Sequence, residues 1–206
     1  MSLEPDPRHP DGPAPPAFNF TFDPSVAAYD VPLQTYVDAH PEFDAVATGA
    51  LVFSREPATG ARRILLLQRA AHDSMPLRWE IPGGACDLDD PTLLHGLARE
   101  LWEESRVVLR HVSALVTLGS GAPDLGKGSQ DGAVFFSRRG LRIIKYSFLV
   151  EAEEPIEVVL DPNEHANFLW ATEEDVRTGK VGDVKLTMTT DQQAATIREA
   201  FRLASQ

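Results

Sequence analysis

The sequence is poor in cysteine, in basic side chains and in long apolar runs. Cys86 is the one cysteine among 206 residues, so no disulfide can form within the chain, which fits a reducing compartment. No run approaches the roughly 20 apolar residues that a membrane-spanning helix needs. The N-terminal residues contain neither a basic region nor an apolar core, so we expect no secretory signal and no membrane partner. The expectation is a cytoplasmic protein.

Acidic side chains outnumber basic ones by 31 to 19, which gives a formal net charge of −12. General nucleic-acid binders carry a basic surface, so this charge argues against a nucleic-acid partner. It does not argue against phosphate-bearing substrates, because carboxylates recruit divalent cations that reverse the local field. With 43% hydrophobic and 24% charged residues, the composition is that of a globular protein with a buried core. Both a monomer and a homodimer remain open.

The length favours one domain with extensions. Residues 1–17 hold six of the 16 prolines and almost no large apolar side chains, which predicts a flexible N-terminal tail. Residues 18–46 begin with three phenylalanines at alternate positions, so we expect a short strand and a short helix packed on the main domain. Residues 47–206 are predicted to form that domain.

Short apolar runs alternate with two helical patterns in the main domain. Asp90 and Pro91 predict the start of the first helix, as an N-cap followed by proline at the first helical position. The alternation predicts an α/β fold in which helices cover the faces of a mixed β-sheet. The predicted strands are residues 50–53, 64–67, 79–81, 112–118, 143–150 and 168–171, and the last predicted helix is 188–204.

Three carboxylates on the first helix are the strongest chemical signal. Glu100, Glu103 and Glu104 lie at i, i+3 and i+4, so they project from one helix face, beside the apolar stripe rather than on it. Like charges at this spacing repel one another and do not stabilise a helix. A bound Mg²⁺ or Mn²⁺ would remove the repulsion, since hard divalent cations take carboxylate ligands. The alternative is a solvated acidic helix face.

The residues around these carboxylates resemble the Nudix box. That motif begins with a glycine, followed after five residues by Glu and after seven more by Arg-Glu-apolar-x-Glu-Glu-x-Gly-apolar. In this chain the similar residues are Gly84, Asp90 and residues 99–107 (RELWEESRV). Residues 79–84 (WEIPGG) are similar to the Trp-Glu-Phe-Pro-Gly-Gly sequence that often precedes the box. The resemblance extends from about residue 45 to the C-terminus. It implies the Nudix fold, a mixed sheet sandwiched between helices in an α/β/α arrangement.

The chain departs from the motif at two places. Asp90 matches the box Glu, but eight rather than seven residues separate it from Arg99. The resemblance implies that Arg99 orients the preceding loop by pairing with Asp89 or Asp90. Arg106 stands where the family has a glycine that ends the helix in a left-handed conformation, which costs a residue with a Cβ roughly 1 kcal/mol or more. The exit from the helix is therefore left open.

The resemblance implies a metal-dependent hydrolase that cleaves the diphosphate bond of a nucleoside diphosphate linked to another moiety. It implies that Glu100, Glu103 and Glu104 hold Mg²⁺ or Mn²⁺ and that the backbone carbonyl of Gly83 completes the ligand shell. The partner would be a small-molecule diphosphate, which the sequence does not identify further. The catalytic base varies within the family, so Glu103, Glu104 and a downstream carboxylate all remain candidates.

Several residues outside the motif are further candidates. Glu164 lies in a predicted turn before a strand, either as the downstream base or as an exposed loop residue. Glu80 either touches a metal-bound water or points outward from its strand. Arg69 and Lys145 are predicted to contact substrate. The alternative for Lys145 is that it belongs to a cluster of solvated charges near a turn. His165 is interpreted as a turn residue rather than a proton shuttle.

Two rival hypotheses remain beside the hydrolase. A Nudix-fold ligand-binding or regulatory module without turnover is motivated by Arg106 and the longer loop. Retention of all three helix carboxylates argues against it, because a pure binder does not need to concentrate like charges. An isomerase on the same fold has no specific support in the sequence, although this fold hosts many activities.

Overall fold

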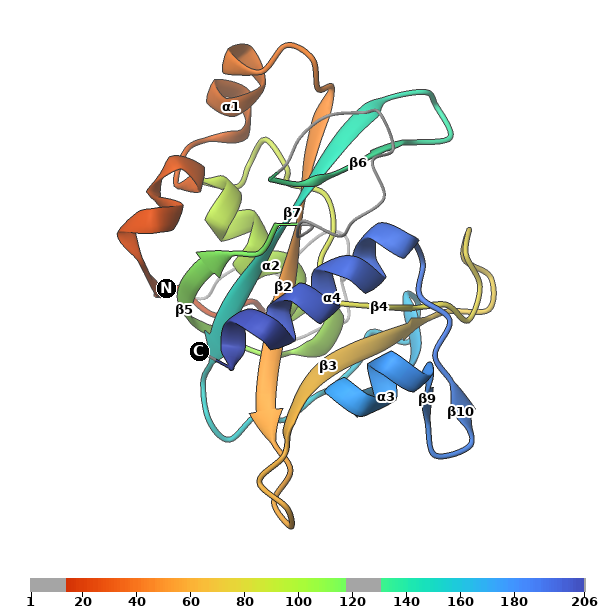
Figure 1. Cartoon of the computed structure of the whole chain (residues 1–206). Helices are drawn as coiled ribbons and strands as arrows, with labels where there is room; N and C mark the ends of the chain where they lie inside the picture. The colour runs from red at the N-terminus through yellow and green to blue at the C-terminus, as the bar shows by residue number, and fades with distance from the viewer. Residues whose placement is uncertain (1–13, 118–130, 206) are drawn as a thin grey trace.

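The computed structural model describes residues 14–117 and 131–205, so the expected tail at 1–17 lies mostly outside the described residues. The strands, labelled in Figure 1, are β1 (Thr21–Phe22), β2 (Ala45–Arg55), β3 (Arg62–Arg69), β4 (Trp79–Glu80), β5 (Leu109–Leu115), β6 (Ala133–Phe136), β7 (Arg142–Ala152), β8 (His165–Thr172), β9 (Lys180–Val181) and β10 (Val184–Lys185). The helices are the 3-10 helix η1 (Pro24–Tyr29), α1 (Leu33–Ala39), α2 (Leu93–Ser105), α3 (Glu173–Thr178) and α4 (Asp191–Ala204).

A mixed sheet is built around the long strand β2. Its order is β1-β5-β7-β2-β3-β4, with β6 paired to β7 and β8 paired to β3 (Figure 1). The first part of β2, Ala45 to Val52, runs parallel to β7, and its end, Phe53 to Arg55, runs antiparallel to β3. One strand therefore joins both halves of the sheet and fixes the side chains of either half relative to one another.

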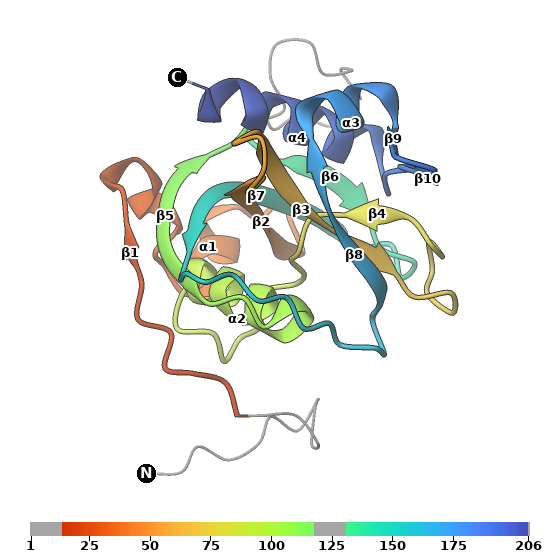
Figure 2. The same ribbon diagram turned by 90° about the horizontal axis from the view of Figure 1, so that it is seen from below.

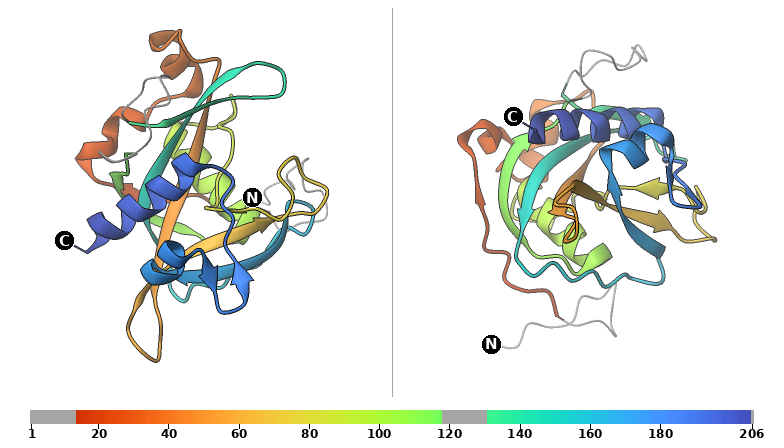
Figure 3. Two further views of the ribbon diagram at one scale, coloured as in Figure 1. Left: turned by 45° about the vertical axis from the view of Figure 1, so that its right-hand side comes forward. Right: turned by 60° about the horizontal axis from the view of Figure 1, so that its bottom comes forward.

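Helices α2 and α4 cover opposite faces of this sheet, as Figures 2 and 3 show. Leu97 and Leu101 of α2 belong to one buried cluster, and Ile197 and Phe201 of α4 belong to the other. Residues 64–67 of β3 are all fully buried and alternate between the two clusters. A strand covered on both faces needs such a continuous apolar run. The predicted α/β/α arrangement of a mixed sheet between helices is confirmed.

Residues 18–46 form β1, η1 and α1 on the α2 side of the sheet. The strand expected at the alternating phenylalanines is reduced to β1, which pairs in parallel with β5. Val26 of η1 and Tyr36 of α1 are buried in the same cluster as the apolar side of α2. This segment therefore contributes side chains to the core on the face of the sheet that carries the box helix.

The start of α2 differs from the prediction. Thr92 is the N-cap, and its hydroxyl accepts a hydrogen bond from the His95 amide at 3.3 Å, whereas Asp90 lies two residues before the cap. The Asp90 carboxylate instead accepts a hydrogen bond from the Asp87 amide at 2.7 Å and pairs with Arg99. The N-cap prediction for Asp90 was wrong because its side chain is used to close the loop.

The end of α2 shows how the chain tolerates arginine in place of glycine. Arg106 is the C-cap in a left-handed conformation, with φ 58° and ψ 11°. Its guanidinium carbon lies 4.0 Å from the centre of the Trp102 ring, one turn earlier on the same helix. A cation over an indole face contributes about 0.5–1 kcal/mol, which offsets much of the left-handed strain. The backbone geometry that the motif requires is therefore kept.

Other element bounds differ modestly from the predictions. β5 spans Leu109–Leu115 rather than 112–118, and α4 begins at Asp191 after a Thr190 N-cap rather than at 188. The short helix α3 and the β9–β10 hairpin were not predicted, because each is only a few residues long. In the described parts of the chain, no helix combines the length and hydropathy needed to cross a membrane.

Candidate active site

The loop between β4 and α2 brings the box carboxylates against the sheet. The amides of Thr48 and Ala50 on β2 donate to the carbonyls of Gly84 and Pro82, at 2.9 and 2.8 Å. At Gly83, φ is +138° and a Cβ would lie 2.2 Å from the Thr48 carbonyl oxygen, so only glycine fits there. The Pro-Gly-Gly turn is thus required by a close approach of two backbones.

Two of the three helix carboxylates are buried rather than solvated. Glu103 and Glu104 are 7% and 6% exposed, because the β4–α2 loop and the chain leading into β8 cover this side of α2. Glu100 is half-buried beside Gly84, where a Cβ would come within 2.4 Å of the Glu100 carboxylate. A solvated acidic helix face is therefore ruled out.

Arg99 neutralises one part of the carboxylate group. Its guanidinium forms a two-point ion pair with Asp90, at 2.8 and 2.9 Å, and also donates to Glu100 at 2.7 Å and Glu103 at 3.0 Å. A further N–H donates to the Ala85 carbonyl at 2.9 Å. Burial alone would lower the pKa of Arg99, but the bonds to Asp90 and the charge of Glu100 raise it. We call Asp90, Arg99, Glu100 and Glu103 the Arg99 cluster.

Of the two predicted partners of Arg99, Asp90 is the correct one. Asp90 is 7% exposed and faces the guanidinium, whereas Asp89 is exposed to solvent. The insertion of one residue relative to the motif is absorbed in the loop before α2. Arg99 therefore locks that loop to the helix, as the resemblance implied.

Glu104 lies on the other side of the site and lacks a comparable partner. Its Oε2 accepts a hydrogen bond from the Gly83 amide at 2.7 Å, and among the described residues no Lys or Arg forms an ion pair with it. Burial raises the pKa of Glu104 well above its ordinary value, and the charges of Glu100 and Glu80 raise it further. An ionised Glu104 is costly in this position unless a cation binds.

Glu80 on β4 faces Glu104 and is held by Arg69 of β3. Arg69 forms ion pairs with Glu80 and with Asp73, the latter at 2.6 Å. Burial alone would raise the pKa of Glu80. The adjacent His165 ring and the cationic side chains of Lys145 and Arg69 outweigh burial and hold this pKa below its ordinary value. Glu80 therefore stays ionised inside the site.

Lys145 reaches the site from β7 across β2. A Cβ on Gly49 would lie 2.9 Å from Lys145 Cε and 2.8 Å from Ile81 Cδ1, so the missing side chain leaves the path for the lysine. The charge of Lys145 lowers the pKa of both Glu80 and Glu104. Gly49 was not among the residues predicted from the sequence, although a glycine inside an apolar strand is a signal for such a close approach.

His165 lies in the site, and its place differs from the prediction. It is the first residue of β8, is 3% exposed, and places Nε2 3.5 Å from Glu80 Oε1 and 3.9 Å from Glu104 Oε1. The turn before it is closed by Asp161, whose carbonyl accepts from the amides of Glu164 and His165 at 3.2 and 2.9 Å. Interpreting His165 as a simple turn residue was wrong, because the turn ends one residue earlier. We call Glu80, Glu104, Glu164 and His165 the Glu104 cluster.

The donor set fits a divalent cation. One ligand atom each from Glu104, Glu164 and His165 lie within 4.8 Å of one another, and oxygen and imidazole donors suit divalent metals. Neither ring nitrogen of the buried His165 has a hydrogen-bond partner within the described residues. Gly83 reaches Glu104 through its amide, so its carbonyl as a metal ligand stays a prediction. The structure thus brings the predicted carboxylates, Arg69 and Lys145 into one site.

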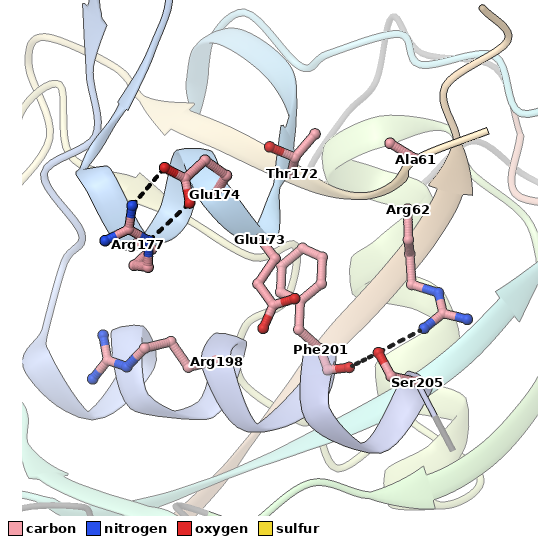
Figure 4. A pocket seen from close by; sticks show the side chains of 9 residues that line it. All are labelled: Ala61, Arg62, Thr172, Glu173, Glu174, Arg177, Arg198, Phe201 and Ser205. Atoms are coloured by element: carbon pink, nitrogen blue, oxygen red, sulfur yellow. Dashed lines mark hydrogen bonds and ion pairs between the residues drawn. The ribbon is translucent and has the colours of Figure 1, made fainter. Parts of the chain in front are cut away.

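A pocket in the described structure lies away from these residues. A cavity of about 530 Å³ lies between α3, α4 and the β2–β3 hairpin (Figure 4). Arg177 is paired there with Glu174 at 2.6 Å, and Arg62 donates to the Ser205 hydroxyl at 3.2 Å. None of the candidate catalytic residues lines this cavity. The chemistry is therefore assigned to the box helix and not to this pocket.

Comparison with known proteins agrees with this site. The family model "NUDIX domain" matches residues 44–191, whereas no curated protein matches the chain. A C. elegans Ap4A hydrolase, in a binary complex, is 18% identical with TM-score 0.55 and covers 78% of this chain and 98% of its own. The MutT protein of Methanosarcina mazei Go1 is 21% identical with TM-score 0.53, covering 79% and 96%. The NUDIX domain of Shewanella oneidensis NrtR, complexed with ADP ribose, is 18% identical with TM-score 0.53, covering 83% and 98%.

The chain belongs to the Nudix family. The family model spans most of the described domain, and the box carboxylates occupy the helix and loop geometry that the motif requires. The class is that of hydrolases acting on phosphorus-containing anhydrides. The low identities of the solved structures show a shared fold and no particular substrate.

Proposed function

We propose that this chain is a divalent-metal-dependent diphosphatase that cleaves a nucleoside diphosphate linked to another moiety. The observation that carries the proposal is the buried Glu104, which faces Glu80 and His165 without an ion-pairing Lys or Arg among the described residues. Burying this charge is costly for an inert module, but it is what a cation site requires. In support, Arg106 preserves the left-handed helix end, which removes one motive for the inert-module hypothesis.

Within the proposal, each group of residues has a distinct task. Glu100, Glu103 and Glu104 are the helix ligands for Mg²⁺ or Mn²⁺, with Gly83 as a backbone ligand. When bound, such a cation shields the anionic phosphates and lowers the pKa of a water. Arg99 holds Glu100 and Glu103 in fixed orientations, so their carboxylates do not need to be ordered during binding.

The remaining residues act on the substrate and on the attacking water. Lys145 supplies positive charge beside Glu80 and Glu104 for a phosphate oxygen, and Arg69 holds Glu80 in place. Glu103, Glu104 and the exposed Glu164 are the candidates for the general base. Water forms a new P–O bond, the bridging P–O bond breaks, and the leaving phosphate takes the electron pair.

The substrate class is proposed from the chemistry of the site and the relatives. The C. elegans structure is an Ap4A hydrolase, and the Shewanella domain is complexed with ADP ribose. Ap4A and ADP ribose are both nucleotides with a phosphoanhydride bond. A site in which Lys145 lies among several carboxylates suits a substrate that arrives with its own bound cation. We therefore propose dinucleoside polyphosphates and ADP-ribose-type diphosphates as the first substrates to test.

A substrate panel tests the proposal directly. The panel contains Ap4A, ADP-ribose, nucleoside triphosphates, nucleotide sugars and an isoprenoid diphosphate, each with Mg²⁺ or Mn²⁺, and products are separated by chromatography. Hydrolysis in H₂¹⁸O shows which phosphorus is attacked. Glu104→Gln should lower product formation by about 100-fold or more. Glu157→Gln, at an exposed glutamate outside the site, is the matched control. No product from any substrate with either metal would overturn the proposal.

A further inference from the structure

His165 is placed in the site by an irregularity in the β3–β8 pairing. Gln68 pairs with Asn167, but the next residue, Arg69, pairs with His165 and not with Ala166. A β-bulge of this kind redirects side chains, and such bulges are common beside active sites. The chain that leads into β8 passes the end of α2 (Figure 2), where the Asp161 amide lies 3.4 Å from the Glu104 carbonyl. The bulge therefore turns His165 toward Glu104.

The His165 imidazole is buried, and neither of its ring nitrogens forms a hydrogen bond within the described residues. The His165 side chain is 2% exposed, and both Nδ1 and Nε2 lack a hydrogen-bond partner within the described residues. The 3.5 Å approach of Nε2 to Glu80 Oε1 is longer than an ordinary hydrogen bond. Buried polar groups in folded proteins are almost always paired, and an exception requires an explanation such as an ion.

The neighbouring oxygens complete a set of metal ligands. The ligand atoms of Glu104, Glu164 and His165 lie within 4.8 Å of one another. In an octahedral site, opposite ligands lie about 4.2 Å apart, so small side-chain shifts would close these three around one ion. Two carboxylates and one neutral imidazole would leave further positions for water and for substrate oxygens. The Nudix box itself supplies only one of these three residues.

We propose that His165 supplies a nitrogen ligand to a cation held with Glu104 and Glu164, and that this ligand makes the site prefer Mn²⁺ over Mg²⁺. The inference rests on the proposed function, since it assigns the metal preference of the same site. Mg²⁺ is bound almost entirely through oxygen, whereas imidazole favours transition metals. Replacing the nitrogen by oxygen should therefore weaken Mn²⁺ binding more than Mg²⁺ binding.

Calorimetric titration of the metal-free full chain with MnCl₂ and with MgCl₂, without substrate, measures this preference. We expect His165→Asn to reduce the ratio of Mn²⁺ to Mg²⁺ affinity by about 10-fold. The matched control is His111→Asn on β5, since the His111 ring bonds to the exposed Thr21 hydroxyl, outside the site. An unchanged ratio in His165→Asn, or no Mn²⁺ binding by the wild type, would overturn the proposal.

A spectroscopic measurement avoids dependence on a variant that fails to fold. Wild-type protein carrying ¹⁵N-labelled histidine is loaded with Mn²⁺, and electron spin echo modulation detects a directly bonded nitrogen. We expect ¹⁵N coupling in the wild type and in His111→Asn and its loss in His165→Asn. Bound Mn²⁺ without ¹⁵N coupling would overturn the histidine ligand while leaving diphosphate hydrolysis intact. Coupling in a protein that hydrolyses no diphosphate would overturn the proposed function and retain the metal ligand.

Discussion

The Arg99 cluster and the Glu104 cluster are built around neighbouring residues of α2, and they treat buried carboxylates in opposite ways. In the Arg99 cluster, one guanidinium bonds to Asp90, Glu100 and Glu103 at 2.7–3.0 Å. In the Glu104 cluster, the Glu104 carboxylate accepts a hydrogen bond from the Gly83 amide at 2.7 Å. It lies beside the Glu80 carboxylate and the His165 ring, whose nitrogens have no hydrogen bond within the described residues. The carboxylates of the first cluster are paired with a guanidinium, whereas Glu104 forms no ion pair with a Lys or Arg among the described residues.

This difference separates a structural task from a chemical one within a single motif. Buried carboxylates that have their own cation fix the loop to the helix and contribute to a defined geometry. A buried carboxylate without a paired cation destabilises the folded protein while the site is empty. A cation that binds there stabilises the folded protein. The motif therefore contains both the support of the site and the site itself.

The largest expected effect is on stability, from removing the cation of the Arg99 cluster. Arg99→Met leaves Asp90, Glu100 and Glu103 without the guanidinium, and breaking a buried ion pair on one side costs about 3–5 kcal/mol. The measurement is urea unfolding of the metal-free protein. Arg177→Met, which breaks the exposed pair with Glu174, is the control and should have no measurable effect. Equal losses in both variants would mean that the Arg99 cluster is not structural.

The next effect distinguishes the two clusters by one substitution in each. Glu103→Gln and Glu104→Gln should each lower turnover by about 100-fold or more, because each removes charge from the metal site at constant size. Their effects on the metal-free protein should differ in sign. Glu103→Gln loses its ion pair with Arg99 and should lower the melting temperature, whereas Glu104→Gln relieves a buried charge and should raise it.

Steady-state rates and melting curves of the two variants check this contrast. Glu157→Gln serves as the control for loss of one negative charge at an exposed position. If both site variants melt alike, Glu103 and Glu104 do not belong to different clusters. If both retain near-wild-type rates at saturating metal, neither acts on the reaction.

Added metal should stabilise the wild type through the Glu104 cluster. A cation that binds only the folded state at about 100 times its dissociation constant adds roughly 2.7 kcal/mol. For a chain of this size that corresponds to a rise of roughly 5–10 °C in melting temperature. The Glu103→Gln/Glu104→Gln double variant should show no rise. A wild-type melt that Mg²⁺, Mn²⁺ and a non-hydrolysable diphosphate together leave unmoved would indicate that the site binds no cation.

The smallest expected effect concerns the left-handed end of α2. Arg106→Gly removes the strain of a Cβ, worth about 1 kcal/mol, but also removes the guanidinium from the Trp102 ring, worth about 0.5–1 kcal/mol. The free energy of unfolding should therefore change by less than about 0.5 kcal/mol. Arg106→Ala keeps the strain without the ring contact and should be less stable than either protein. Equal stability of the glycine and alanine variants would show that the left-handed strain is negligible.

Much of the support of the site was predictable from sequence, because it depends on local spacing. Residues 64–67 are uniformly apolar, which indicates a strand covered on both faces. The resemblance to the Nudix box implied that Arg99 pairs with Asp89 or Asp90, and Asp90 is the partner in the structure. The three glutamates at i, i+3 and i+4 predicted one carboxylate face on the helix.

Other features could not be predicted, because each depends on a partner far away in the chain. Asp90 has the local signature of an N-cap, but Arg99 takes its side chain and Thr92 becomes the cap. The local sequence around His165 indicates a turn, and only the bulge against β3 turns its ring inward. Lys145 reaches the site because Gly49 on the neighbouring strand leaves a path.

The sequence by itself determined the family, the α/β/α layering and the carboxylates of the box helix, because hydrophobic period and motif spacing are local properties. Tertiary structure decided which of those carboxylates form an ion pair with another side chain of the protein. Arg99 reaches Glu100 and Glu103 on its own helix. The loop and strands that bury Glu104 instead place Glu80 and His165 beside it, and no Lys or Arg among the described residues forms an ion pair with it. A carboxylate's cost or benefit depends on which charges surround it once it is buried, and folding alone brings those charges together.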